Sequence, residues 1–139
     1  MIVPDEQLLG YGLLAPMAQW YRGTVIDITR LRPNTVIQDE AIPTLLRRAR
    51  RPTFVTINVA DFWRRLVPDR RFCIACVAVP HTRAQEVSNL LRRLFALGPF
   101  RSRSQRLGKI VRISQRQVQY YAVDSRVVQR MAWPTTQRS

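Results

Sequence analysis

The 139-residue chain is poor in the side chains that build the commonest zinc and nucleophile sites. It has one histidine, His81, and two cysteines, Cys73 and Cys76. A structural zinc site takes about four such ligands, and an activated serine or cysteine takes a basic partner, most often histidine. His81 follows Pro80 directly before an expected helix, which is typical of a loop or helix-cap residue. The sequence therefore supports neither a zinc site nor a nucleophile triad.

The two cysteines are spaced as Cys-x-x-Cys, a spacing that also occurs in redox and zinc motifs. Here they lie inside the apolar run Phe72–Val79, which predicts a strand covered on both faces. Residues three apart in a strand point to opposite faces, whereas a redox pair is placed at a helix N-terminus. We therefore expect both cysteines to belong to the hydrophobic core.

Long hydrophobic runs are also missing. No apolar stretch approaches the roughly 20 residues that a membrane-spanning helix needs, and the first residues do not follow a signal-peptide pattern. Hydrophobic residues nevertheless make up 46% of the chain, which is typical of a globular protein. We expect one domain over residues 1–130 with a partly ordered tail at 131–139, a cytoplasmic location and no membrane partner.

Acidic residues are scarce, with nine against 23 basic residues and a net charge of +14. Residues 1–62 carry six acidic and seven basic residues, whereas residues 63–139 carry three acidic and sixteen basic residues. All basic residues but Lys109 are arginine. A genome rich in G and C would explain the preference for arginine over lysine, but not the surplus of base over acid. The second half is suited to a polyanion, of which nucleic acid is the commonest.

Apolar runs and helical periodicity alternate along the chain and predict an α/β fold with a mainly parallel sheet flanked by helices. Strands are expected at residues 2–4, 24–28, 53–57, 72–79, 109–113 and 117–123, the last two forming a C-terminal β-hairpin. Helices are expected at residues 7–20, 38–50, 59–66 and 82–97. Residues 100–108 are expected to form a basic loop.

Acidic and amide side chains stand where the expected strands give way to helices. Asp5 follows the first strand, and Asp39 opens a helix. Asn58 and Asp61 follow the strand at residues 53–57. The carboxyl ends of neighbouring parallel strands meet at one edge of a sheet, where ligands usually bind. We therefore expect these side chains to converge on a site for Mg²⁺ or Mn²⁺, which prefer oxygen ligands.

Each acid also has a structural interpretation. Asp39 and Glu40 would stabilise the positive end of a helix dipole, and Asp61 would serve as a helix cap. Asp5 would be a solvated surface residue. Asp27, within the expected strand, would face solvent or pair with an arginine. Only the coincidence of three acids at strand-to-helix junctions favours a metal site.

Three segments resemble a known family, in the same order along the chain. Thr56–Phe62 is similar to a T-x-D-x-D-F element, Met1–Leu8 to an opening xxLLDENL, and Gln38–Ile42 to an sDeeI helix start. These elements belong to the PIN-like predicted nucleases of toxin–antitoxin systems, and the resemblance covers roughly residues 1–80. It implies a carboxylate cluster on a parallel α/β sheet and a ribonuclease that depends on Mg²⁺ or Mn²⁺. It also implies the catalytic set Asp5, Asp39, Asn58 and Asp61, with the three aspartates as metal ligands.

The chain departs from the family pattern within the site itself. Asn58 stands where aspartate is usual, and one residue is inserted before Asp61. One hypothesis is therefore a metal-dependent endoribonuclease, with a toxin of a toxin–antitoxin pair as its special case. The alternative is a PIN-like protein that binds RNA or a partner without cutting. A third hypothesis is a basic subunit that pairs with an acidic protein such as an antitoxin.

The basic surplus includes a cluster that follows the expected helix at residues 82–97. We expect these side chains to hold the phosphate groups of RNA electrostatically, unless they form an ordinary solvated surface. They are Arg101, Arg103, Arg106, Lys109 and Arg112. A homodimer is a further partner compatible with the sequence.

Overall fold

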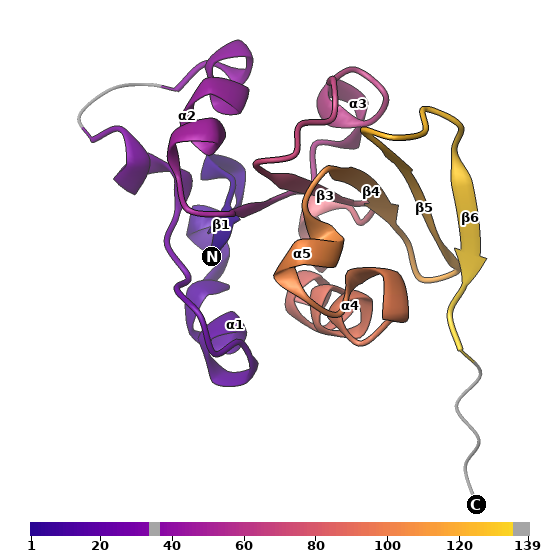
Figure 1. Cartoon of the computed structure of the whole chain (residues 1–139). Coiled ribbons are helices and arrows are strands. Elements are labelled where there is room, and N and C mark those ends of the chain that lie inside the picture. The colour runs from indigo at the N-terminus through magenta and orange to yellow at the C-terminus, as the bar shows by residue number, and fades with distance from the viewer. Residues whose placement is uncertain (34–36, 135–139) are drawn as a thin grey trace, which may run out of the picture.

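The computed structural model describes residues 1–33 and 37–134, which form an α/β fold around a mixed sheet of six strands (Figure 1). The strands are β1 (Ile2–Pro4), β2 (Thr53–Thr56), β3 (Cys73–Val77), β4 (Lys109–Ile113), β5 (Gln117–Ala122) and β6 (Gln129–Ala132). The α-helices are α1 (Leu14–Trp20), α2 (Ile42–Arg48), α3 (Val59–Phe62), α4 (Glu86–Phe95) and α5 (Arg103–Arg106). Short 3-10 turns lie at Glu6–Tyr11, Ile28–Leu31, Asp39–Ala41, His81–Arg83 and Gly98–Phe100.

The strands lie in the sheet in sequence order, from β1 at one side to β6 at the other. Strands β1 to β4 are parallel, with Val3 opposite Phe54 and Phe54 opposite Ile74. Strand β5 then turns back antiparallel to β4, and β6 pairs antiparallel with β5. The predicted α/β class, the mainly parallel sheet and the C-terminal hairpin are confirmed.

The chain changes direction across the sheet at β1. Ile2 pairs with Thr53 of β2 on one side and forms an isolated parallel bridge with Val25 on the other. Its amide donates to the carbonyl of Thr24 at 2.8 Å, and its carbonyl accepts from Ile26 at 3.1 Å. The segment that follows β1 in sequence therefore lies on one side of it, and β2 lies on the other. In parallel sheets, ligands usually bind at the carboxyl edge beside such a reversal of strand order.

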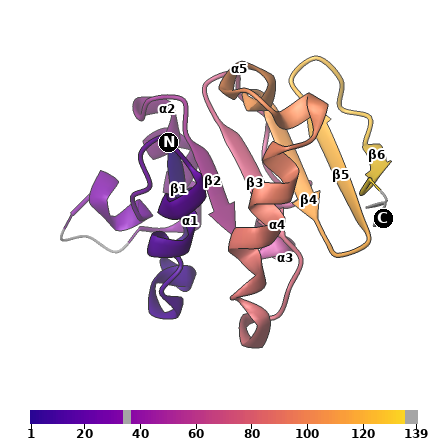
Figure 2. The same cartoon turned by 90° about the horizontal axis from the view of Figure 1, so that it is seen from below.

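Helices cover both faces of the sheet. Figure 1 shows α2 and α3 above the strands and α1 and α4 below them, and Figure 2 views the molecule from the α1 and α4 side. Alternate residues of each strand enter the two layers, because successive side chains point to opposite faces. Cys73 lies in the core under α1 and α4, and Cys76 lies in the core under α2 and α3.

Both cysteines are free and fully buried, as predicted, and burial raises the pKa of each thiol to about 12. A thiol with so high a pKa carries almost no thiolate at neutral pH, which is the form that reacts or binds metal. Their role is to pack the two faces of β3.

Several expected elements differ from the structure. The strand expected at residues 24–28 is reduced to the Val25 bridge, and Asp27 caps the turn Ile28–Leu31 by accepting from the Thr29 amide at 3.0 Å. The helix expected at residues 7–20 is split at Gly12, whose φ of 63° is a left-handed conformation that favours glycine. The basic loop expected at residues 100–108 contains α5, which Ser102 and Gln105 open with a capping box.

The sheet also extends past residue 130. Met131 and Ala132, expected in the tail, belong to β6, and the rest of that tail at 135–139 lies outside the described residues. Trp133 donates from Nε1 to the carbonyl of Ser114 at 2.7 Å, and the Arg93 guanidinium lies 4.4 Å from the centre of its ring. These contacts attach the end of the described chain to the β4–β5 turn and α4. None of the helices in the described ranges is long and apolar enough to cross a membrane.

Candidate functional site

Asp5 lies at the carboxyl end of β1, where the chain changes direction across the sheet. Its side chain is only 5% exposed, so it is not the solvated surface residue that one interpretation of the sequence would make it. The Thr56 hydroxyl, at the end of β2, donates to Asp5 Oδ2 at 2.7 Å. Burial raises the pKa of Asp5, and the charge of Asp39 adds to this, whereas the hydrogen bond from Thr56 opposes it.

A chain of hydrogen bonds connects Asp5 to Asp61. Thr56 Oγ1, which donates to Asp5, accepts the backbone N–H of Asn58 at 3.0 Å. The Asn58 side chain then caps α3: its Oδ1 accepts from the Asp61 amide at 3.3 Å, and its Nδ2 donates to Asp61 Oδ2 at 2.7 Å. Three of the four predicted catalytic residues are therefore linked at one edge of the sheet.

Asp39 reaches this group electrostatically. It opens the 3-10 turn Asp39–Ala41, which leads directly into α2. Asp39 is exposed, but the desolvation it does undergo raises its pKa, and repulsion from Asp61 and Glu40 raises it further. Since Asp39 also acts on Asp5, the three predicted ligands form a row of carboxylates in which neighbours repel each other.

The donor chemistry of this row suits Mg²⁺ or Mn²⁺, since carboxylate oxygens come from three separate elements. The row is looser than a finished metal centre. Within residues 1–33 and 37–134, no three His, Cys, Asp or Glu side chains are grouped closely enough to hold a metal ion. The residues thus fit the cation in chemistry, and binding would require the carboxylates to draw together.

The five predicted phosphate-binding residues do not form one surface. Arg101, Arg103 and Arg106 lie together before β4, on the amino side of the parallel strands. Lys109 shares a face of β4 with Val111, and its Nζ donates to the Pro99 carbonyl at 2.8 Å. Arg112 alternates with it, so it belongs to the other face, where its Nη1 donates to Gln119 Oε1 at 3.2 Å.

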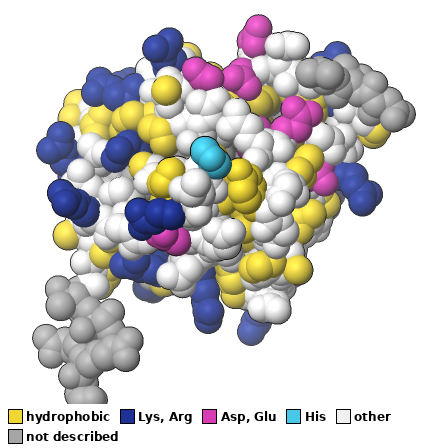
Figure 3. Space-filling model, turned by 180° about the vertical axis from the view of Figure 1, so that it is seen from behind, with side chains coloured by type: hydrophobic (Ala, Val, Ile, Leu, Met, Phe, Trp, Pro, Cys, Tyr) yellow, Lys and Arg dark blue, Asp and Glu magenta, His cyan; other side chains and the backbone are white. Residues whose placement is uncertain are grey.

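The acids and the arginine cluster therefore lie at opposite edges of the parallel strands. A strand of four residues such as β2 separates its two ends by roughly 13 Å. In Figure 3, the acidic side chains in view gather mainly along the top and upper right, and most Lys and Arg side chains lie at the left and lower margins. On this face, most acidic side chains therefore lie apart from most basic ones.

The chain matches no family model, and comparisons with curated proteins and with solved structures find no significant match.

Sequence reasoning missed two parts of this arrangement. Thr56 connects Asp5 to Asn58, and its place as the first residue of the T-x-D-x-D-F-like element was the available signal. Arg22 and Arg50 line a pocket with the arginines that precede β4. Nothing in the sequence spacing indicates that juxtaposition, because the arginines come from three distant segments.

Asp39→Asn should raise the thermal midpoint at pH 7 and leave it unchanged at pH 3. The folded-state pKa of Asp39 lies above its ordinary value of 3.8, so folding disfavours the ionised form. That penalty is absent below the unfolded-state pKa, develops as pH rises through the folded-state pKa, and is complete at neutral pH. Thermal unfolding at both pH values measures the effect. Asp124→Asn, an exposed change away from the row, should give no such gain at pH 7; an equal gain there would contradict the assigned repulsion.

Proposed function

We propose that this protein is a metal-dependent endoribonuclease of PIN-like type. The observation that carries the proposal is the hydrogen-bonded chain from Asp5 to Asp61 at the carboxyl edge, with the charge of Asp39 close enough to act on both. It lies beside the point where the chain reverses across the sheet. A bound cation would lower the repulsion between the carboxylates of such a row. Cation binding therefore explains why the carboxylates lie so near one another, which helix capping alone does not. The resemblance to toxin–antitoxin nucleases adds an acidic antitoxin protein as a partner class.

Each residue has a separate part in this mechanism. Asp5, Asp39 and Asp61 would hold Mg²⁺ or Mn²⁺, which supplies an activated water for attack on an RNA phosphodiester. Thr56 donates to Oδ2 of Asp5, and the backbone N–H groups of Glu6 and Gln7 also donate to this carboxylate, so that Asp5 is held in place at the end of β1. Asn58 orients Asp61 through its amide and caps α3 at the same time. Exposed arginines of the basic half would attract the RNA backbone, with Arg101 and Arg103 among them.

A second function, RNA or partner binding without cleavage, is favoured by one specific contact. Asn58 Nδ2 occupies Asp61 Oδ2, so a hydrogen bond already satisfies part of the charge that a cation would neutralise. Asn58 also brings no charge of its own. In this alternative, the acidic row is structural, and the positive surface alone determines what the protein binds.

Metal titration separates the two functions. Isothermal titration with Mn²⁺ should show binding to the wild type, reduced in Asp39→Asn and Asp61→Asn and unchanged in Asp124→Asn. Single-stranded RNAs of varied sequence should be cut with Mg²⁺ or Mn²⁺ and left intact in EDTA. RNA binding without Mn²⁺ binding or cleavage would replace the nuclease by the second function.

Asn58→Asp should raise Mn²⁺ affinity by on the order of tenfold, because an added charge near the cation contributes about 1 kcal/mol or more. It should hold or raise cleavage. Without metal, the same variant should lose stability, since the bond from Asn58 Nδ2 to Asp61 Oδ2 becomes a repulsion between carboxylates. Titration calorimetry and thermal unfolding with and without Mn²⁺ measure the two effects. Unchanged affinity would remove Asn58 from the proposed site.

A further inference from the structure

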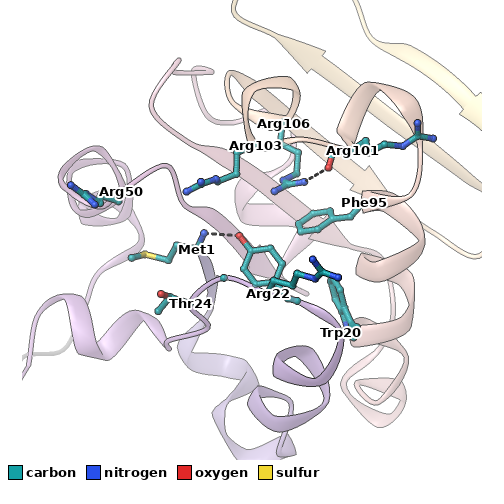
Figure 4. A pocket seen from close by; sticks show the side chains of 11 residues that line it. Met1, Trp20, Arg22, Thr24, Arg50, Phe95, Arg101, Arg103 and Arg106 are labelled. Carbon is teal, nitrogen blue, oxygen red and sulfur yellow. Dashed lines mark hydrogen bonds between the residues drawn. The ribbon is translucent and has the colours of Figure 1, made fainter.

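A pocket of about 660 Å³ opens at the amino edge of the parallel strands, away from the acidic row. Five of its eleven lining residues are arginines and none is acidic. Figure 4 shows Arg103 and Arg106 on one side of the cavity, facing Met1 and Thr24, with Arg50 at one end. The Arg101 side chain runs away from the cavity, and its Nη2 donates to the Ala96 carbonyl at 3.2 Å. The charge directed into the pocket is therefore positive and unopposed.

Arg106 is the unusual member of this group, because it is a charged side chain only 5% exposed. Its Nη1 donates to the carbonyls of Phe100 and Arg101 at 2.9 and 3.1 Å, while no described residue accepts a hydrogen bond from its Nε. The ion pairs among the described residues are Arg47–Asp69 and Arg83–Glu86, so no carboxylate neutralises it there. A buried charge without a counter-ion is costly, and a bound anion would offset that cost.

Aromatic rings close the other end of the pocket. Trp20, Tyr21 and Phe95 pack edge to face, with ring centres 5.6 to 6.0 Å apart. The Arg106 guanidinium lies 3.9 Å from the centre of the Phe95 ring, which joins the charged and aromatic parts. Trp20 and Phe95 lie beside each other at the cavity wall in Figure 4. The pocket thus offers guanidinium groups for a phosphate and an apolar wall for a planar ring.

We propose that this pocket binds the terminal phosphate of a nucleotide, carried either by a free nucleotide or by the end of an RNA strand. Its volume is within the range of small-molecule sites and exceeds what an inorganic phosphate fills. Arg103 and Arg106 would bind the phosphate, and the wall of Trp20 and Phe95 would contact the base or the ribose. The inference does not rest on cleavage, because the pocket and the acidic row are at different edges of the sheet.

Titration calorimetry in EDTA tests the pocket without any contribution of a metal site. AMP should bind, while adenosine should bind much more weakly and inorganic phosphate should bind with lower affinity than AMP. Arg103→Ala should weaken AMP binding by about tenfold to a hundredfold, the usual worth of a hydrogen bond to a charged group. Arg103 is exposed, so this variant should fold as the wild type does. Arg116→Ala, at the exposed β4–β5 turn, is the matched control and should bind AMP normally.

RNA ends provide the second arm. Oligoribonucleotides with and without a 5′- or 3′-phosphate are compared for the same two variants. Preference for a phosphorylated end, lost in Arg103→Ala, would identify the RNA terminus as the source of the phosphate. Tighter binding of AMP than of the phosphorylated oligoribonucleotides would identify a free nucleotide as the source. Equal binding of AMP and adenosine, or an equal loss in Arg116→Ala, would overturn the proposal. So would the absence of both AMP binding and any preference for phosphorylated ends.

Discussion

Asp61→Asn should abolish RNA cleavage while leaving the fold intact. Asparagine has the volume of aspartate, and its oxygen can still accept the hydrogen bond that Asn58 Nδ2 donates to position 61. The backbone N–H of residue 61 can still donate to Asn58 Oδ1, which keeps the cap of α3. Only the negative charge is lost. Removing an outer partner of a metal ligand typically costs 10- to 100-fold, so removing a ligand should cost about 100-fold or more.

Cleavage of a labelled RNA under single-turnover conditions measures the loss, and circular dichroism with thermal unfolding reports the fold. Asp124→Asn makes the same chemical change at the opposite edge of the strands and should cut as the wild type does. Full activity in Asp61→Asn would exclude Asp61 as a metal ligand. The proposed metal site would then fail, even though the protein cuts RNA, whatever the arginine pocket binds.

The buried strands were predictable because their signals are local. An apolar run such as the one at β3 can be satisfied only by covering both of its faces, whatever its neighbours are. The strand expected around Val25 has β-branched residues too, but it forms a single bridge with Ile2. Strand β6 was missed for the opposite reason: its residues are mostly exposed, and it exists because β5 offers an open edge.

The acidic row was predictable from topology and the arginine pocket was not. Asp5, Asn58 and Asp61 each follow a strand that has to end at the carboxyl edge, so their convergence needs only parallel pairing. The pocket depends on where the segments at Arg22, Arg50 and Arg103 meet in space. From the sequence we also expected Arg101, Arg103 and Arg106 to be equivalent phosphate contacts. In the structure, Arg106 is buried, whereas Arg101 and Arg103 are exposed.

The separation of the two sites constrains how RNA would engage the protein. An RNA strand bound at the amino edge would have to extend roughly 13 Å or more along the sheet to reach the acidic row. At about 3.4 Å for each stacked nucleotide, that distance takes about four nucleotides, and fewer where the RNA is extended. If both proposals hold with an RNA end in the pocket, cleavage would fall at a short, fixed distance from that end. If the pocket takes a free nucleotide, the two sites would act separately.

Arg106→Ala should destabilise the protein by about 3 kcal/mol, whereas Arg103→Ala should change stability by less than about 0.5 kcal/mol. The Arg106 side chain fills buried space against Phe95, and its loss leaves the carbonyls of Phe100 and Arg101 without their donor. Each buried carbonyl left without a hydrogen bond costs about 1–3 kcal/mol of stability, and the cavity left by the deleted side chain adds to this loss. Relief of the unneutralised charge acts the other way and keeps the total near the stated value.

Urea unfolding measures both changes, with the m-value as a check that the denatured states are comparable. Arg106→Met, which keeps volume and a sulfur contact with Phe95, should lose less stability than Arg106→Ala.

The double variant Arg101→Ala and Arg103→Ala should keep its stability and flatten the salt dependence of RNA binding, by about 0.7 in log–log slope for each lost phosphate contact. If Arg106→Ala proved as stable as Arg103→Ala, Arg106 would act as a surface residue and the buried cation of the pocket would be excluded. Full destabilisation with an unchanged salt slope in the double variant would instead make Arg106 structural and remove Arg101 and Arg103 from the RNA path.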